Sequence, residues 1–116
     1  MTKQLDPVAI AALREIAEGE AEFVTELVSN FLQSGGPGLL AEMRQALAQS
    51  DVVALTRAAH SLKSNAATLG AVELRKLCAE LELAGRSGTL AGADEKVAQI
   101  ELEYERTRPA LESLCR

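Results

Sequence analysis

Residues 51–72 read DVVALTRAAHSLKSNAATLGAV, and their apolar residues recur at alternating spacings of three and four. That spacing places them on one face of an α-helix, the face that packs against the rest of a domain. Ser50 and Asp51 can cap the start of this helix, and Gly70 suits the left-handed residue that follows its end. We therefore expect a helix over residues 51–69 with a buried face made of Val52, Leu55, Ala59, Leu62, Ala66 and Leu69.

His60 is the single histidine of the chain, and the helical pattern turns it away from the buried face. With about 100° per residue, its side chain lies roughly 130° from the centre of the apolar face. We therefore expect the imidazole to face solvent. Its neighbours within two helical turns are two cations and several small side chains: Thr56, Arg57, Lys63, Ser64 and Ala67.

Length and composition favour one helical domain. A chain of 116 residues can bury a core without disulfides or structural metals. Hydrophobic residues make up 47% of the sequence but aromatic residues only 3%. Ala, Leu and Glu are abundant, which favours helices over strands. The sequence therefore predicts a single all-α domain spanning residues 1–116.

The N-terminal part predicts three helices before the one that carries His60. Asp6 and Pro7 form a helix-start signal, and Gly19 ends the resulting helix over residues 6–17. A second apolar pattern covers residues 20–33. The segment SGGPG at residues 34–38 interrupts it, as a sharp kink or a short loop, before a third helix over residues 37–49.

Two further helices follow Gly70. The first covers residues 71–84 and is expected to end at Gly85, and Thr89 can cap the second, over residues 89–115. Pro109 predicts a kink near residues 105–109, or fraying beyond it, because proline removes a backbone hydrogen bond and clashes with the preceding turn.

Short turns join the last four predicted helices, which therefore fold most simply as an up-down-up-down bundle over about residues 37–115. The helices within about residues 6–34 would then cover one end or one flank of that bundle.

The charge balance and the cysteines exclude several classes of function. A net charge of -5, with no cluster of Lys and Arg, argues against nucleic-acid binding. The first twenty residues contain no apolar run of signal-peptide or membrane-span length. Cys78 and Cys115 form neither a disulfide framework nor a zinc motif, and Cys78 is expected to pack as a small hydrophobe. We expect a cytoplasmic, soluble chain that contacts neither membrane nor nucleic acid.

An exposed histidine can bind a metal, act as a general base or carry a phosphoryl group. The Glu and His partners of a metal site are absent around His60, and Ser61 or Ser64 on the same helix brings no oxyanion hole. A phosphate carrier needs only an accessible ring nitrogen and nearby cations, which Lys63 and Arg57 can supply. From the helical pattern alone, an ordinary surface histidine is as good an interpretation of His60 as a phosphate carrier.

The stretch AAHSLKSNAATLGAVELRKLCAELE, residues 58–82, resembles the signature helix pair of histidine-containing phosphotransfer (Hpt) domains. The usual form there is H-x-L-K-G-S-x-x-x-L-G, and the matching positions are His60, Leu62, Lys63, Leu69 and Gly70. The resemblance extends to most of the chain. Ser64 stands where the family usually has Gly, and Asn65 where it usually has Ser.

The resemblance implies a monomeric bundle without catalytic machinery of its own, in which His60 accepts a phosphoryl group from receiver-domain aspartates and passes it on. Lys63 would face the phosphate. The expected partners are response-regulator receiver domains, a hybrid sensor histidine kinase, or both, within a bacterial-type multistep phosphorelay. The receiver would bring the aspartate and Mg²⁺, so this chain is expected to hold no metal and no cofactor.

The expected partner-binding residues surround the histidine on its helix: Val53, Thr56, Arg57, Ser64 and Ala67. Ser64 would add a hydroxyl donor or obstruct the receiver, and Asn65 would hydrogen-bond a neighbouring helix. Two rival interpretations stay open. One is a phosphate-independent adaptor that docks a receiver or kinase, and the other is the dimerisation helix pair of a histidine kinase.

Overall fold

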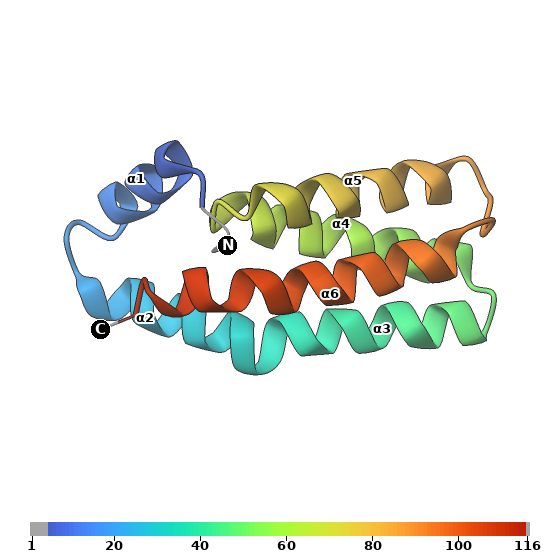
Figure 1. Cartoon of the computed structure of the whole chain (residues 1–116), viewed down its shortest axis with the longest axis horizontal. Helices are drawn as coiled ribbons and strands as arrows, with labels where there is room; N and C mark the ends of the chain where they lie inside the picture. Colours follow the sequence, from blue (N-terminus) through green and yellow to red (C-terminus); the bar gives the residue numbers. More distant parts are fainter. Residues whose placement is uncertain (1–4, 116) are drawn as a thin grey trace.

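The computed structural model describes residues 5–115, which contain no β-strand. The helices are α1 (Pro7–Ile16), α2 (Ala21–Asn30), the π-helical segment η1 (Phe31–Gly35), α3 (Gly36–Ala48), α4 (Val52–Thr68), α5 (Val72–Arg86) and α6 (Ala93–Glu112). Helices α3 to α6 run antiparallel to their neighbours in an up-down-up-down bundle, with α4 packed most extensively on α5 (Figure 1). The predicted all-α bundle is confirmed, and one chain supplies all of its helices, unlike a dimerising helix pair.

Helix α4 has the predicted ends and the predicted buried face. The Asp51 carboxylate accepts a hydrogen bond of 3.0 Å from the Ala54 N–H and caps the first turn. Gly70 has a φ of +73°, and the Ala71 N–H donates to the Ala66 carbonyl at 2.8 Å, which closes the last turn. Five residues of the predicted apolar face are buried: Leu55, Ala59, Leu62, Ala66 and Leu69. The sixth, Val52, is half-buried.

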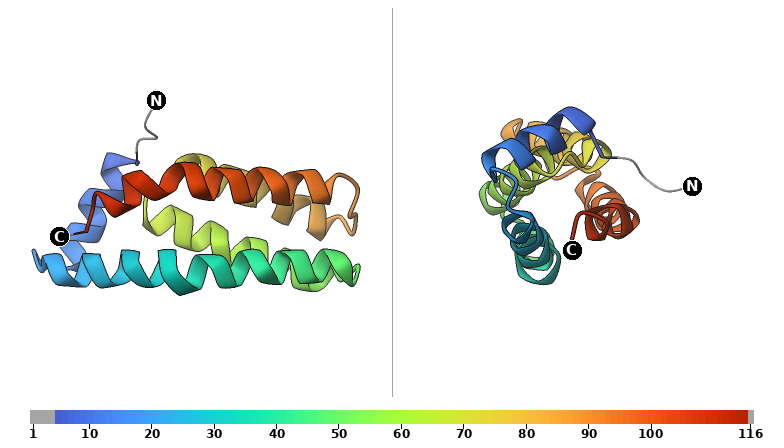
Figure 2. Two further views of the ribbon diagram at one scale, coloured as in Figure 1. Left: turned by 60° about the horizontal axis from the view of Figure 1, so that its bottom comes forward. Right: turned by 90° about the vertical axis from the view of Figure 1, so that its left-hand side faces the viewer.

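Helix α1 covers one end of the bundle, next to the turn between α4 and α5 (Figures 1 and 2). Asp6 caps α1 by accepting from the Val8 N–H at 3.0 Å, as predicted. The Asp6 N–H donates to the Gly70 carbonyl at 2.8 Å. A Cβ at Gly70 would lie 3.0 Å from the Asp6 backbone, so Gly70 serves both its left-handed turn and this close contact.

The Gly-rich segment at residues 34–38 does not interrupt the chain's helical course. Helix α2 continues through η1 into α3, and the three form one long rod in the left panel of Figure 2. Tyr104 of α6 stabilises the widened π turn, because its hydroxyl donates to the Leu32 carbonyl at 3.1 Å and lies 3.3 Å from the Phe31 carbonyl. The prediction of a kink or loop here is therefore wrong.

The C-terminal helices differ from the prediction at their ends. Helix α5 continues through Gly85 to Arg86, and α6 begins at Ala93 after Gly92, whose φ is +74°. The Thr89 hydroxyl accepts from the Ala91 N–H within the connecting turn and does not cap α6. Helix α6 continues past Pro109 to Glu112, so the predicted fraying beyond the proline is wrong.

Both cysteines are free thiols. Cys78 is fully buried in the core, as predicted, and burial raises its pKa to about 12. None of the described helices has the length and the apolar character needed to cross a membrane.

Candidate functional site

His60 faces solvent from the middle of α4, as the helical pattern predicts, and its side chain is 55% exposed. Its Nδ1 atom lies 2.9 Å from Oε2 of Glu82, a residue of the neighbouring helix α5. The Glu82 side chain is only 5% exposed. The Nδ1 edge of the ring is thus held by a buried carboxylate, while more than half of the side chain remains exposed.

Glu82 binds two cations as well as the histidine. Lys63 Nζ lies 2.6 Å from Oε1 of this carboxylate. Arg86, one turn further along α5, places Nη2 2.7 Å and Nε 3.2 Å from Oε2. The three basic side chains therefore converge on one buried acid.

The hydrogen bonds from Lys63 and then Arg86 lower the pKa of the Glu82 carboxyl to about 2, although burial opposes this shift. Glu82 is therefore ionised at neutral pH and can only accept hydrogen bonds. In the neutral imidazole, the ring proton must then lie on Nδ1 of His60, where it donates to Glu82. This tautomer leaves the lone pair on Nε2, the nitrogen that does not contact Glu82.

An open groove of about 420 Å³ lies beside the histidine between α4 and α5. Its lining consists of Val52, Val53, Thr56, Arg57, His60, Glu82, Gly85 and Arg86. Of the predicted partner-binding residues, Val53, Thr56 and Arg57 thus share one surface with His60. Val53 is 65% exposed.

The remaining predicted residues lie outside this groove. Ser64 and Ala67 are exposed on α4. Lys63 contacts the Glu82 carboxylate, with 31% of its side chain exposed.

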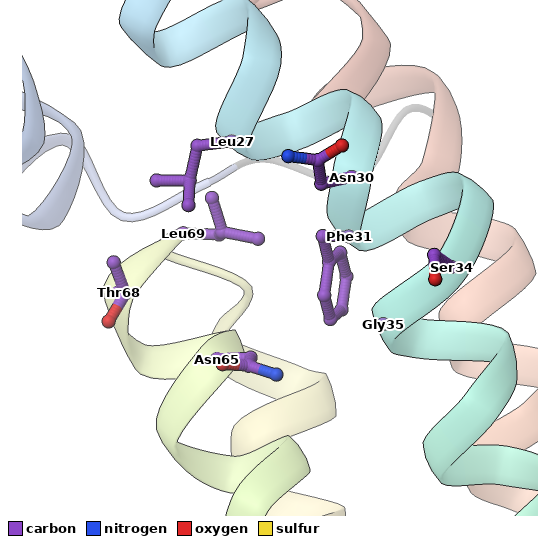
Figure 3. Close-up of a pocket in the computed structure, with 8 residues that line it drawn as sticks. All are labelled: Leu27, Asn30, Phe31, Ser34, Gly35, Asn65, Thr68 and Leu69. Carbon is purple, nitrogen blue, oxygen red and sulfur yellow. The ribbon is translucent and has the colours of Figure 1, made fainter.

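Asn65 differs from its prediction, because it is exposed and its side chain makes no hydrogen bond to any residue within 5–115. It lines a second open pocket, of about 520 Å³, between α4 and the α2–η1 junction (Figure 3). In Figure 3, Leu27 and Phe31 approach Leu69 across this pocket. The groove beside His60 and this second pocket share no lining residue.

Glu82 and Arg86 were not predicted as site residues, although both are visible in the sequence as an acid and a base four residues apart. A further signal was available. Helices α4 and α5 form a hairpin about Gly70 and Ala71, so positions at equal distances from residue 71 meet across it. His60 precedes that residue by eleven positions and Glu82 follows it by eleven.

The described part of the chain contains no group of three or more His, Cys, Asp or Glu side chains arranged to hold a metal ion. The side chains that contact one another at this site are one histidine, one carboxylate and two cations.

Comparisons with known proteins agree on one family. Residues 26–110 match the family model described as "Hpt domain". The crystal structure of histidine-containing phosphotransfer protein B from Pseudomonas aeruginosa PAO1 is similar, with a TM-score of 0.85 and 31% sequence identity. That match covers 97% of the present chain and 95% of the other. No curated protein sequence matches significantly.

Proposed function

The chain belongs to the Hpt domain family, whose members carry phosphoryl groups in phosphorelays, and we propose on this premise that His60 is its phosphoacceptor. In this proposal His60 accepts a phosphoryl group from an aspartate of a receiver domain and returns it to an aspartate of the same or another receiver. The observation that carries the proposal is the contact between His60 Nδ1 and the ionised Glu82, because it presents Nε2 as the nucleophile.

The transfer step follows from this geometry. The Nε2 lone pair attacks the phosphorus of the partner's aspartyl phosphate, and a P–N bond forms. The bond between phosphorus and the aspartyl oxygen breaks, and its electrons leave with the aspartate carboxylate. The imidazole ring becomes cationic while its Nδ1 proton stays bonded to Glu82. A buried carboxylate in contact with the ring stabilises that developing charge, and the reverse transfer uses the same groups.

Lys63 and Arg86 are the cations that can neutralise the phosphoryl oxygens. Both contact Glu82, which keeps them beside His60, and 64% of the Arg86 side chain is exposed. Lys63 can act as a mobile point charge, and Arg86 offers a planar fork of donors. Arg57 lines the same groove and adds a third positive charge to the approach path.

The groove beside His60 is the proposed docking surface for the receiver. The exposed Val53 supplies apolar area, and Arg57 and Arg86 supply positive charge that suits the acidic phosphorylation site of a partner. Ser64 and Ala67 would extend this surface along α4. The receiver would hold Mg²⁺ and supply the catalytic groups, while this chain acts as a monomeric carrier in the cytoplasm.

The experiment uses a panel of receiver domains phosphorylated with ³²P, incubated with the chain in the presence of Mg²⁺. We expect label on the wild-type chain that is labile in acid and stable in alkali, as for phosphohistidine, and none on His60→Gln. Receivers that bind both proteins equally but never label the wild type would instead support a phosphate-independent adaptor.

A further inference from the structure

Gly85 lies in α5, where this helix packs closely against Thr56 of α4. It is buried, and its backbone does not adopt a positive φ. A Cβ built at Gly85 would overlap with Oγ1 of Thr56 in α4, and would lie 3.1 Å from the Thr56 Cβ and 3.5 Å from its Cα. The missing side chain therefore makes room for Thr56.

Thr56 cannot easily move aside from this contact. Its hydroxyl donates to the Val52 carbonyl at 2.8 Å, and rotation about χ1 would break that hydrogen bond. Threonine has two preferred χ1 rotamers in a helix, but the 3.1 Å distance to the Thr56 Cβ is the same in both of them. Any atom added at Gly85 would therefore push the two helix backbones apart.

The close approach is one helical turn from the proposed phosphorylation site on both helices. Gly85 follows Glu82 by three residues, and Thr56 precedes His60 by four, so both pairs are neighbours on their helix surfaces. Separation of the helices at Gly85 and Thr56 would lengthen the distance between Glu82 and His60, which is 2.9 Å. Hydrogen bonds from N–H to oxygen have donor–acceptor distances of about 2.7–3.2 Å, and a contact at about 3.6 Å no longer counts as one.

We propose that Gly85 is a positioning residue, which sets the α4–α5 spacing so that Glu82 can hold the Nδ1 proton of His60 and expose Nε2. This inference rests on the proposed phosphotransfer function for its meaning, but the tautomer can be measured without any phosphate. Gly85 acts through Glu82 and does not touch the reacting atoms.

The test is ¹⁵N NMR of the His60 imidazole over a pH series, and the ring proton is assigned from the spectra of the neutral ring, which no longer change with pH. We expect the proton mainly on Nδ1 in the wild type, and a population shifted several-fold toward Nε2–H in Gly85→Ala. The double variant Gly85→Ala/Thr56→Ala lacks the overlapping hydroxyl. Its ratio of Nδ1–H to Nε2–H tautomers should therefore be close to that of Thr56→Ala alone. Gly38→Ala is the matched control, because a Cβ at this helical glycine meets no atom within 4 Å.

A folded Gly85→Ala variant with the wild-type tautomer would overturn the proposal. If that variant does not fold, the double variant decides the question. Recovery of both the fold and the Nδ1 proton supports the proposal, and failure to recover either one overturns it. A wild-type chain that shows the Nδ1 proton but accepts no phosphate would contradict the proposed function and leave the positioning role of Gly85 supported.

Discussion

Oε2 of Glu82 contacts both Nδ1 of His60, at 2.9 Å, and the guanidinium of Arg86, at 2.7 Å. The histidine is therefore one of several basic groups that share a buried carboxylate, and it is the one whose second nitrogen remains free for chemistry. Removal of the Glu82 charge should therefore slow phosphoryl transfer more than removal of the charge of an exposed acid on α5.

Glu82→Gln tests this charge. The amide oxygen can still accept a hydrogen bond from Nδ1, but it cannot stabilise a cationic ring. We expect the initial rate of phosphoryl transfer from a phosphorylated receiver to fall about tenfold or more, or ~1.4 kcal/mol of transition-state stabilisation. Glu80→Gln is the control on the same helix, because Glu80 is exposed and pairs with Lys96. Equal rates for the two variants would contradict the role of Glu82.

The pH dependence of stability should report the same carboxylate. The pKa of Glu82 is lowered from 4.5 to about 2 in the folded chain. Its stabilising contribution is therefore complete above the ordinary pKa and is lost as pH falls toward the folded value. We expect the unfolding free energies of wild type and Glu82→Gln, measured by urea titration, to converge between about pH 5 and pH 2. Parallel curves over that window would show that Glu82 is not stabilised by its cations.

The apolar pattern of residues 51–72 was sufficient to predict α4, because Asp51, Gly70 and the buried face each depend on local sequence alone. The bundle followed from short turns between amphipathic segments. Glu82 was not identified, because a buried acid on α5 acquires its role only from the side chains that reach it across the hairpin. A prediction from spacing within one helix could not include that contact.

The Gly-rich segment at residues 34–38 could not be assigned from its own sequence either. Glycine and proline at this spacing usually end a helix. Here Tyr104, about seventy positions later, supplies a hydroxyl to the carbonyls of the π turn and fills the space above Gly36. A tertiary contact therefore overrides the local signal for a break.

Lys63→Gln tests the proposed contact with phosphate. Removal of this charge should slow transfer to His60 by roughly tenfold and shorten the half-life of the phosphorylated chain, because fewer cations neutralise the phosphoryl oxygens. The measurement is retention of ³²P over time after removal of the receiver. Lys96→Gln is the control, because Lys96 of α6 forms an ion pair with Glu80 of α5. If Lys96→Gln and Lys63→Gln lose phosphate at the same rate, Lys63 has no specific role.

The outward position of His60 predicts a contrast in stability with its neighbour Leu62. His60→Ala should change the free energy of unfolding by about 0.5 kcal/mol or less, as at most surface positions. Leu62 is fully buried, so Leu62→Ala should cost ~2–5 kcal/mol through the cavity that it leaves. Urea unfolding followed by circular dichroism measures both. A larger loss for the histidine variant would contradict its placement on the solvent side of α4.

Gly36 and Gly38 provide a matched pair for the packing of the π-helical segment. A Cβ at Gly36 would lie 2.5 Å from Oη and 2.7 Å from Cζ of Tyr104, whereas a Cβ at Gly38 meets nothing within 4 Å. Gly36→Ala must therefore displace the Tyr104 ring, whose hydroxyl bonds the carbonyls of the π turn, and should destabilise the chain by ~1–3 kcal/mol.

Gly38→Ala should stabilise the chain by ~0.5–1 kcal/mol, because alanine is the better helix former and meets no obstacle. The two variants thus differ in sign although they are two residues apart in the same helix. Thermal and urea unfolding of both proteins provide the measurement, and Gly36→Ala/Tyr104→Phe separates the hydroxyl from the ring. If Gly36→Ala is as stable as Gly38→Ala, then Tyr104 does not determine the course of the chain through this segment.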